Sequence, residues 1–296
     1  MMRYFAAEVA DNERLGGGYF RLDIAGCEAL MGAEPGQFVM VRGDWDRDPL
    51  LPRAFSLLAV SASGHAQILA KTVGRGTALL ERAGRGTPLS LLGPLGTQFP
   101  APDPAFTDLL VGGGVGIPPL YMQASKASRA GRELAATTEV LYGGRSGQDL
   151  VLLDELRAFG VDLHLATEDG TVGRAGRVTV ELAARLGHHR RGPRRPALRI
   201  MACGPNPMLW AVAALARADD VPCFLSVEEQ MACGIGVCLG CAIPGTGRPF
   251  RYVCKDGPVF PASELRLPDG PTAVAAASSA PATPPGPTGN DSLRRP

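Results

Sequence analysis

The sequence predicts a multidomain protein in which an antiparallel β-barrel is followed by an α/β domain with a parallel sheet and by a small cysteine-rich C-terminal domain. Three observations predict this fold class. Short alternating apolar runs fill residues 1–100, apolar strands then alternate with helical stretches, and four cysteines follow with the spacing of a metal-cluster site. A chain of 296 residues also exceeds the size at which one hydrophobic core usually keeps growing.

The composition argues against several kinds of partner. Thirty basic and 29 acidic residues leave a net charge of +1, so we expect neither nucleic acid nor an acidic membrane surface as the main partner. Glycine or charge interrupts the apolar runs far short of the roughly 20 residues that a membrane span needs. The N-terminus lacks the charged and apolar regions of a secretory signal, and we therefore expect a soluble, cytoplasmic protein with reduced cysteines.

Residues 1–100 carry the signs of an all-β barrel or sandwich. The apolar runs at 19–24, 37–41 and 67–73 are separated by Gly, Pro and Asp, as in all-β domains. Arg53-Ala54-Phe55-Ser56 places a cation and a hydroxyl at a strand start, and Gly76-Thr77 stands where a helix could begin. Together these motifs could hold a pyrophosphate, because a guanidinium pairs with phosphate oxygens and a helix start offers free N–H groups. Each motif alone is also common on solvated strand ends and in turns.

Three prolines in residues 100–104 mark a domain boundary. Beyond it we expect parallel strands at residues 109–111, 139–142, 161–166 and 198–202, and helices at about 118–130, 149–158, 178–186 and 206–217. The loops after three strands, residues 112–116, 143–146 and 203–206, would then share the sheet edge at which α/β proteins bind ligands. The first loop predicts a nucleotide cradle, although Pro119 stands where the third glycine of the dinucleotide fingerprint would fall.

The four C-terminal cysteines predict a [2Fe–2S] cluster. Cys233, Cys238 and Cys241 have the C-x4-C-x2-C spacing of plant-type clusters, and Cys254 follows as a distant fourth ligand. The glycines between them permit a tight loop whose N–H groups turn toward the cluster. A zinc site is an alternative, but zinc ribbons usually bring two short cysteine pairs. We expect Cys27 and Cys223 to be buried apolar side chains.

Two further segments are expected to have no function of their own. The basic run at residues 188–195 contains no aromatic residue and is expected to form a solvated loop. Residues 268–296 are rich in Pro, Ala, Gly, Ser and Thr and are expected to form a disordered tail. The predicted domains are therefore the barrel at 1–100, the α/β domain at 101–222 and the cluster domain at 223–267.

In order along the chain, these motifs resemble the electron-transfer subunits of type B, NAD-dependent dihydroorotate dehydrogenases, a family similar to ferredoxin reductases. The resemblance covers residues 1–267. It depends most on Cys203-Gly204-Pro205 with Pro207-Met208, and on residues 228–241 with the closing segment 253–260. Ala54 stands where relatives often carry proline, which leaves the role of Arg53 intact but fixes the local backbone less.

The resemblance implies the cofactors and their sites. FAD would be bound by Arg53, Ala54, Phe55, Ser56, Ala70, Lys71, Thr72, Gly76 and Thr77. NAD(H) would lie over Gly112, Gly113, Gly114 and Gly116, with Cys203 as the catalytic candidate near the hydride path. The [2Fe–2S] cluster would be held by Cys233, Cys238, Cys241 and Cys254.

The implied function is electron transfer from dihydroorotate oxidation, through the cluster and FAD, to NAD+ in pyrimidine biosynthesis. An FMN-containing catalytic subunit would be the partner, in a heterotetramer with two copies of each chain. No length remains in this chain for a (β/α)8 barrel that could oxidise dihydroorotate itself. Ile235, Val237 and Leu239 could supply an apolar contact with that partner or could pack around the cluster.

Two other interpretations stay open. One is a subunit of an NAD(P)H:ferredoxin-type or hydrogenase-linked reductase, and the other is a zinc-stabilised binding module without redox activity. Among dinucleotides we expect NADH to be preferred to NADPH, because Asp149 would repel a 2′-phosphate near Arg145.

Overall fold

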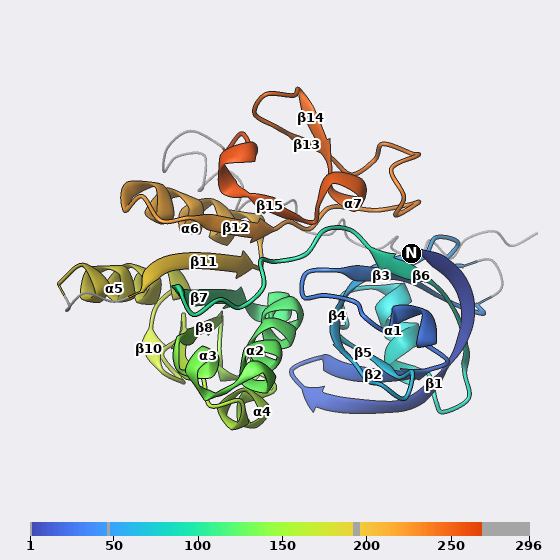
Figure 1. Cartoon of the computed structure of the whole chain (residues 1–296). Helices are drawn as coiled ribbons and strands as arrows, with labels where there is room; N and C mark the ends of the chain where they lie inside the picture. The colour runs from blue at the N-terminus through green and yellow to red at the C-terminus, as the bar shows by residue number, and fades with distance from the viewer. Residues whose placement is uncertain (1, 46–47, 192–195, 268–296) are drawn as a thin grey trace, which may run out of the picture.

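The computed structural model describes residues 2–45, 48–191 and 196–267, and the predicted tail at 268–296 lies outside this part of the chain. The barrel and a parallel sheet lie side by side, and the C-terminal segment covers both at the top of Figure 1. The predicted fold class is confirmed. No helix in the described ranges is long and apolar enough to cross a membrane.

The N-terminal domain is a closed antiparallel barrel with the strand order β1-β2-β5-β4-β3-β6. Its interior is apolar because alternate residues of each strand face inward, as in β2, where Phe20, Leu22 and Ile24 are fully buried. Cys27 is fully buried beside them, as expected. The elements are β1 (Arg3–Gly16), β2 (Tyr19–Ala25), η1 (Glu28–Leu30), β3 (Phe38–Gly43), β4 (Arg53–Val60), β5 (Ala66–Lys71), α1 (Arg75–Arg82) and β6 (Pro88–Leu95).

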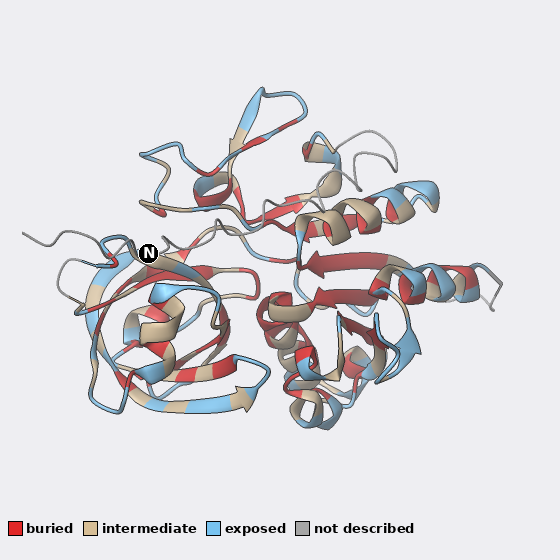
Figure 2. Ribbon diagram, turned by 180° about the vertical axis from the view of Figure 1, so that it is seen from behind, coloured by how far each residue is buried: buried red, intermediate tan, exposed pale blue. Residues whose placement is uncertain are grey.

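The second domain is built on a seven-stranded sheet with the order β10-β9-β8-β7-β11-β12-β15. Its central strands are buried on both faces, as Figure 2 shows, which explains their continuous apolar sequences. The strands of this region are β7 (Phe106–Gly113), β8 (Thr138–Gly144), β9 (Asp162–Thr167), β10 (Arg174–Ala175) and β11 (Ala197–Cys203). The helices are η2 (Gly114–Gly116), α2 (Pro118–Ala130), α3 (Arg132–Ala136), η3 (Gly147–Asp149), α4 (Leu153–Ala158), α5 (Val178–Arg191) and α6 (Asn206–Ala218).

The strand order creates a switch point between β7 and β11. From β7 the chain adds β8 and β9 on one side, and it then returns to place β11 on the other side of β7. The chain therefore continues to opposite faces of the sheet after β7 and after β11. The crevice between these two strand ends is where open α/β sheets bind ligands. Cys203 lies beside Gly112 in the strand register.

Two predicted helices differ from the structure. The helix expected at 178–186 continues to Arg191, so His188 and His189 of the basic run are helical, and residues 192–195 lie outside the described part. The extension is explained by packing, because His189 Nε2 lies 3.1 Å from Glu139 Oε1 on β8. The helix expected at 149–158 begins only at Leu153, since Leu152 has a left-handed φ of 61°.

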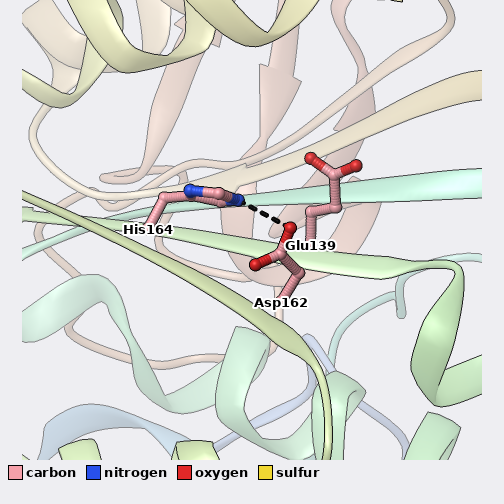
Figure 3. Close-up of side chains that lie close together, drawn as sticks. All are labelled: Glu139, Asp162 and His164. Atoms are coloured by element: carbon pink, nitrogen blue, oxygen red, sulfur yellow. Dashed lines mark ion pairs between the residues drawn. The ribbon is translucent and has the colours of Figure 1, made fainter.

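A cluster of charged side chains fixes α5 to the amino ends of β8 and β9. Glu139, Asp162 and His164 lie close together there (Figure 3), and Arg185 of α5 reaches the Glu139 carboxylate at 2.6 Å and Asp162 at 3.5 Å. Because the guanidinium already occupies these carboxylates, the cluster serves as an ion-pair network. It lies at the edge of the sheet opposite the loops that follow β7, β8 and β11.

The C-terminal segment is an extension of the central sheet. Its elements are β12 (Cys223–Ser226), β13 (Ala242–Pro244), β14 (Phe250–Tyr252), α7 (Val253–Asp256), β15 (Val259–Pro261) and η4 (Ala262–Glu264). The boundary expected after residue 222 falls at the start of β12, which pairs with β11 in parallel and with β15 in antiparallel orientation. The cysteine-rich loop thus leaves the sheet after β12 and returns to it as β15.

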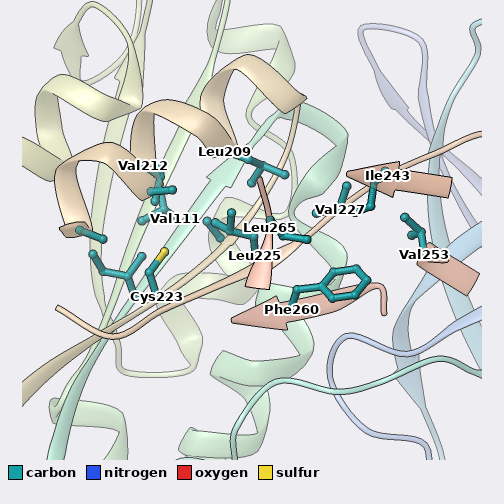
Figure 4. Close-up of a cluster of buried hydrophobic side chains, with 14 of the residues drawn as sticks. Val111, Leu209, Val212, Cys223, Leu225, Val227, Ile243, Val253, Phe260 and Leu265 are labelled. Carbon is teal, nitrogen blue, oxygen red and sulfur yellow. The ribbon is translucent and has the colours of Figure 1, made fainter. Parts of the chain in front are cut away.

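One hydrophobic core joins the three parts. Val111 and Leu225 of the sheet pack in the same cluster as Ile243, Val253 and Phe260 of the C-terminal segment (Figure 4). The cluster also contains the buried barrel residues Phe38, Met40 and Leu95 and two of the predicted iron ligands, Cys241 and Cys254. The C-terminal segment therefore has no separate core within the described residues.

Candidate functional site

A cavity of about 710 Å³ opens at the carboxyl edge of the sheet. The structure brings the three post-strand loops together around it, and the barrel supplies one wall. Its lining includes Tyr19, Lys71, Gly113, Gly114, Gly116, Gly143, Gly144, Arg145, Asp149, Gly204, Pro205, Met208 and Glu228. The predicted site residue Gly112 lies beneath this lining, at the buried end of β7.

Two of the loop glycines lie in close packing, and at Gly116 the approach of the loop after β11 requires glycine. A Cβ atom on Gly116 would lie 2.5 Å from the carbonyl oxygen of Cys203, and one on Gly113 would lie 2.6 Å from the sulfur of Met208. Glycine therefore lets the two loops meet at the switch point and leaves backbone exposed on the cavity side.

Replacing Gly116 by alanine is expected to destabilise the fold by about 1–3 kcal/mol, because the new methyl group meets backbone that cannot rotate away. Chemical denaturation followed by circular dichroism would measure the change. Gly84→Ala is the matched control, since no heavy atom lies within 4 Å of that Cβ position. Equal stability of the two variants would contradict the packing argument.

Cys203 is fully buried in the core below the cavity, while its neighbours Gly204 and Pro205 line the cavity wall. Burial raises the pKa of its thiol, the charge of Glu228 raises it further, and a hydrogen bond with Ser226 only partly opposes them. The thiol is therefore protonated. Any influence of Cys203 on the cavity is exerted through packing.

Glu228 was not singled out from the sequence, although it begins the motif that leads to Cys233. It follows β12 by two residues and lines the cavity. The surrounding protein desolvates the carboxyl and raises its pKa. Its position at the carboxyl edge of a strand was the available signal, but β12 itself was not predicted as part of this sheet.

Lys71, predicted to bind FAD, extends to the α/β domain. Its Nζ lies 2.6 Å from Asp149 Oδ1 and 4.5 Å from the centre of the Tyr19 ring. The expectation that Asp149 would repel a 2′-phosphate is therefore wrong in its physical basis. The Asp149 side chain is 11% exposed, and Lys71 neutralises its carboxylate.

The predicted FAD residues gather around the start of α1. Arg53 begins β4, and a Cβ atom on Gly76 would lie 2.6 Å from its Nε, so the guanidinium rests directly on the glycine backbone. The first N–H groups of α1 have no acceptor within the helix. A guanidinium beside free helical N–H groups is a suitable cradle for a pyrophosphate.

Thr77 and Thr72 organise this cradle through their hydroxyl groups. Thr77 Oγ1 accepts the N–H groups of Val73 at 3.0 Å and Gly74 at 3.1 Å, which fixes the loop before the helix. Thr72 Oγ1 donates to Glu81 of α1 at 3.0 Å and ties the end of β5 to the helix. The hydroxyl of Thr77 is thus committed to the loop, and its backbone N–H remains available to a ligand.

The other predicted FAD residues lie on the strands beside α1. Ala54 is exposed, Phe55 and Ser56 are half-buried on β4, and Ala70 is buried near the end of β5. Because β4 and β5 are antiparallel, the start of one lies near the end of the other.

The predicted iron ligands lie on one glycine-rich loop and on α7. Cys241 and Cys254 are buried, and their sulfur atoms are 3.3 Å apart. The N–H group of Gly236 donates to Cys254 Sγ at 3.0 Å, and Gly236 has a φ of +78° that directs this group inward. Cys238 is exposed at the rim of the loop.

Backbone donors also favour a thiolate at Cys233. Burial alone would raise the pKa of this thiol, but the N–H groups of Cys238 and Ile235, at 3.4 and 3.5 Å from its sulfur, outweigh burial. The pKa of Cys233 falls to about 6. Thiolates with N–H donors around them are the usual ligands of iron–sulfur clusters.

The spacing of the four sulfur atoms bears on the kind of metal group they fit. Within the described residues, no three of these cysteines have sulfur atoms that all lie within 4.8 Å of one another. Four thiolates on one zinc ion, each about 2.3 Å from the metal, would have to lie within about 4 Å of one another. The four sulfur atoms are therefore not gathered within the spacing that one zinc ion requires.

Comparisons with known proteins agree with this geometry. A family model for the iron–sulfur cluster binding domain of dihydroorotate dehydrogenase B matches residues 228–266, and a model for an oxidoreductase NAD-binding domain matches residues 110–214. The electron transfer subunit of dihydroorotate dehydrogenase B (NAD(+)) from Bacillus caldolyticus is 39% identical over 242 residues, which cover 79% of this chain and 87% of that protein. The chain belongs to the family of dihydroorotate dehydrogenase B electron-transfer subunits.

A relative from Aquifex aeolicus, an electron transfer subunit homolog, is 33% identical over 269 residues, or 90% of this chain and the whole of that protein. Among solved structures, an NADH-dependent reduced ferredoxin-NADP oxidoreductase is 27% identical, with a TM-score of 0.73 over 88% of this chain and 89% of that one. The ferredoxin reductase of carbazole 1,9a-dioxygenase, at 23% identity and a TM-score of 0.63 over 75% of this chain and 67% of that one, shares the fold.

Membership of this family identifies the chain as an oxidoreductase subunit with FAD-, NAD- and iron–sulfur-binding domains. The alternative of a zinc-stabilised module without redox activity is therefore wrong.

Proposed function

We propose that the chain carries electrons between a [2Fe–2S] cluster, FAD and NAD(H) for a separate FMN-containing subunit that oxidises dihydroorotate, in pyrimidine biosynthesis. FAD, when bound, supplies the exchange between a two-electron hydride and single electrons. The residues of the chain would hold the cluster, FAD and NAD(H) in this order along the path of the electrons and would shield them from water.

One observation carries the proposal: the same barrel contacts both the cluster loop and the dinucleotide cavity. A Cβ atom on Gly234 would lie 2.6 Å from Met40 Cγ of β3 and 3.3 Å from Leu95 Cδ1 of β6, so this loop packs directly on the barrel wall. Tyr19 and Lys71 of β2 and β5 form a wall of the cavity. A flavin on the barrel would therefore stand between the two electron partners.

The proposed residue roles follow this arrangement. Arg53 and the first turn of α1, with Gly76 and Thr77, would bind the FAD pyrophosphate, and residues 54–56 and 70–72 would border the rest of FAD. Residues 112–116 would hold NAD(H), with Cys203 packed beneath the hydride path. Cys233, Cys238, Cys241 and Cys254 would ligate the cluster.

The rim of the cluster loop is the proposed contact with the catalytic subunit. Ile235 is 41% exposed, Val237 73% and Leu239 51%, which supports a role for these side chains at a surface rather than only in packing around the cluster. Exposed apolar side chains around a buried redox group are suited to a protein interface. Two copies of each chain in a heterotetramer would place each cluster at such an interface.

The purified chain is expected to reduce a dye with NADH but to leave dihydroorotate unoxidised. Adding the FMN-containing subunit should create dihydroorotate:NAD+ activity. Val237→Glu is expected to weaken this coupling at least about tenfold, because it places a charge in an apolar contact, while NADH:dye activity stays unchanged. Val180→Glu, on the exposed face of α5, is the matched control.

Failure of the wild-type pair to form a complex, or equal coupling by the two valine variants, would contradict the proposed partner or its contact surface. The likeness to the NADH-dependent ferredoxin-NADP oxidoreductase favours a second candidate, a subunit of a ferredoxin-linked reductase. Co-purification from native cells separates the two, since the second candidate requires a partner other than an FMN-containing dihydroorotate dehydrogenase.

A further inference from the structure

The carboxylate of Asp149 joins the flavin barrel to the dinucleotide domain at the edge of the cavity. Its Oδ1 atom receives two donors from the barrel, Lys71 Nζ at 2.6 Å and the Tyr19 hydroxyl at 3.1 Å. Tyr19 begins β2 and Lys71 ends β5, and the two residues pair directly in the strand register. One carboxylate oxygen therefore binds two adjacent side chains of the barrel.

The other oxygen of Asp149 holds the loop after β8. Its Oδ2 atom accepts the N–H groups of Arg145 at 3.1 Å and Ser146 at 3.4 Å. The main chain of Asp149 is fixed as well, because its carbonyl oxygen accepts the hydroxyl of the buried Tyr142 at 2.9 Å. The carboxylate thus connects the Arg145–Ser146 backbone, on the dinucleotide side, with two side chains of the barrel.

The backbone around Asp149 is closely packed, so the side chain and its hydrogen-bond partners have little room to move. A Cβ atom on Gly144 would lie 2.6 Å from Asp149 Cβ, and one on Gly17, at the tip of the β1–β2 hairpin, would lie 2.6 Å from the carbonyl oxygen of Gln148. The hairpin tip of the barrel therefore rests directly on η3. A change at Asp149 would be transmitted to both domains.

The protonation states of Asp149 and Tyr19 favour these hydrogen bonds. Burial alone would raise the pKa of Asp149, but the hydrogen bond and charge of Lys71 outweigh it and lower the pKa. Burial raises the pKa of Tyr19, so its hydroxyl remains a donor. The carboxylate of Asp149 and the hydroxyl of Tyr19 consequently keep these roles throughout the neutral range.

We propose that Asp149 is a positioning residue, which sets the dinucleotide-binding loop against the flavin barrel so that the nicotinamide end of NADH meets the flavin. The inference rests on the proposed function, because it assigns the cavity to NAD(H). Tyr19, Lys71, Arg145 and Asp149 all line that cavity, so the connection lies where the two ligands would meet.

A second ion pair between the same domains provides a comparison. Arg21 of β2 lies 2.7 Å from Glu155 of α4, and these two side chains are outside the cavity lining. If Asp149 only held the domains together, loss of either pair would have a similar effect. If Asp149 positions the loop, its loss alone would impair the reaction with NADH.

The test compares Asp149→Asn with Glu155→Gln in the full chain loaded with FAD and cluster. The asparagine oxygen can still accept from the loop N–H groups, but its NH2 group would face the Lys71 ammonium. We expect kcat/KM for NADH:dye reduction to fall about tenfold in Asp149→Asn, the effect of losing one charged hydrogen bond, and to stay within about twofold in Glu155→Gln. Reoxidation by dye of the dithionite-reduced protein, which needs no dinucleotide, should be unchanged in both.

Lys71→Met should reproduce the loss, and Lys71→Arg should restore most of it. The double variant Asp149→Asn with Lys71→Met should be no worse than the poorer single variant, because both remove the same contact. Tyr19→Phe removes only one hydroxyl and should show a smaller loss. Because this change disturbs the packing least, it shows whether the effect arises without misfolding. Additive losses, or equal behaviour of Asp149→Asn and Glu155→Gln, would overturn the inference, whereas wild-type protein that cannot oxidise NADH would overturn the proposed function itself.

Discussion

Replacing Cys254 by serine is expected to remove most of the iron from the protein while its flavin stays bound. Cys254 is 3% exposed, lies 3.3 Å from the sulfur of Cys241 and receives the N–H group of Gly236. A serine oxygen is shorter and harder than a thiolate and is a poor replacement in this site. We expect iron and acid-labile sulfide per flavin to fall by about tenfold or more.

Iron analysis and the visible absorption spectrum would measure this loss. Cys223→Ser is the matched control, because it also buries a hydroxyl, at a residue that is 9% exposed and belongs to the same core. The control should lose stability but keep its iron. Wild-type iron content in Cys254→Ser would refute the ligand assignment, and simultaneous loss of flavin would mean that the shared core couples the two sites.

Replacing Arg53 by alanine is expected to weaken FAD binding about 10- to 100-fold, the range for loss of charge-assisted hydrogen bonds. The guanidinium lies against the backbone of Gly76 in the first turn of α1, where an anion would meet it and the free N–H groups together. Flavin retained after extensive dialysis, and titration of the depleted protein with FAD, would measure the change. Iron content should remain at the wild-type level.

Gly76→Ala provides an independent approach to the same cradle. Its methyl group would lie 2.6 Å from Arg53 Nε and displace the guanidinium without removing it, so a weaker loss of FAD affinity is expected. Arg85→Ala, at an exposed position after α1, is the control for loss of a positive charge. Unchanged FAD affinity in Arg53→Ala would place the pyrophosphate elsewhere.

The cysteine loop and the glycine loop could be recognised from the sequence because their chemistry is local. Cys233, Cys238 and Cys241 lie within one turn-rich segment, and residues 112–116 directly follow a buried strand, so spacing alone indicates how they meet. The alternation of apolar and polar residues also predicted an all-β barrel or sandwich, but the choice of a barrel depended on the family resemblance, because closure is set by the long-range pairing of β1 with β6.

Long-range contacts were beyond what spacing indicates. Lys71 and Asp149 are 78 residues apart, and each belongs to a motif that suggested a different role. The short strand β15 became recognisable only through its pairing with β12. The helical continuation of α5 through His189 likewise depends on Glu139 of a distant strand, a tertiary contact that overrides the local excess of positive charge.

The return of the chain to the sheet has a consequence for how the cluster-binding region behaves as a unit. Ser226 and Val259 are paired neighbours at the base of this region, and the N–H group of Val227 donates to the carbonyl oxygen of Pro258 at 2.9 Å. The excursion is thus closed at its base by main-chain bonds that do not involve iron. Since the entropy of a closed loop depends only weakly on its length, a part of this region that stays outside the shared core, such as the turn between β13 and β14, can vary in length without changing the sheet that carries it. The side chains that enter the core, among them Cys241 and Cys254, instead make the cluster-binding region one folding unit with the barrel and the sheet.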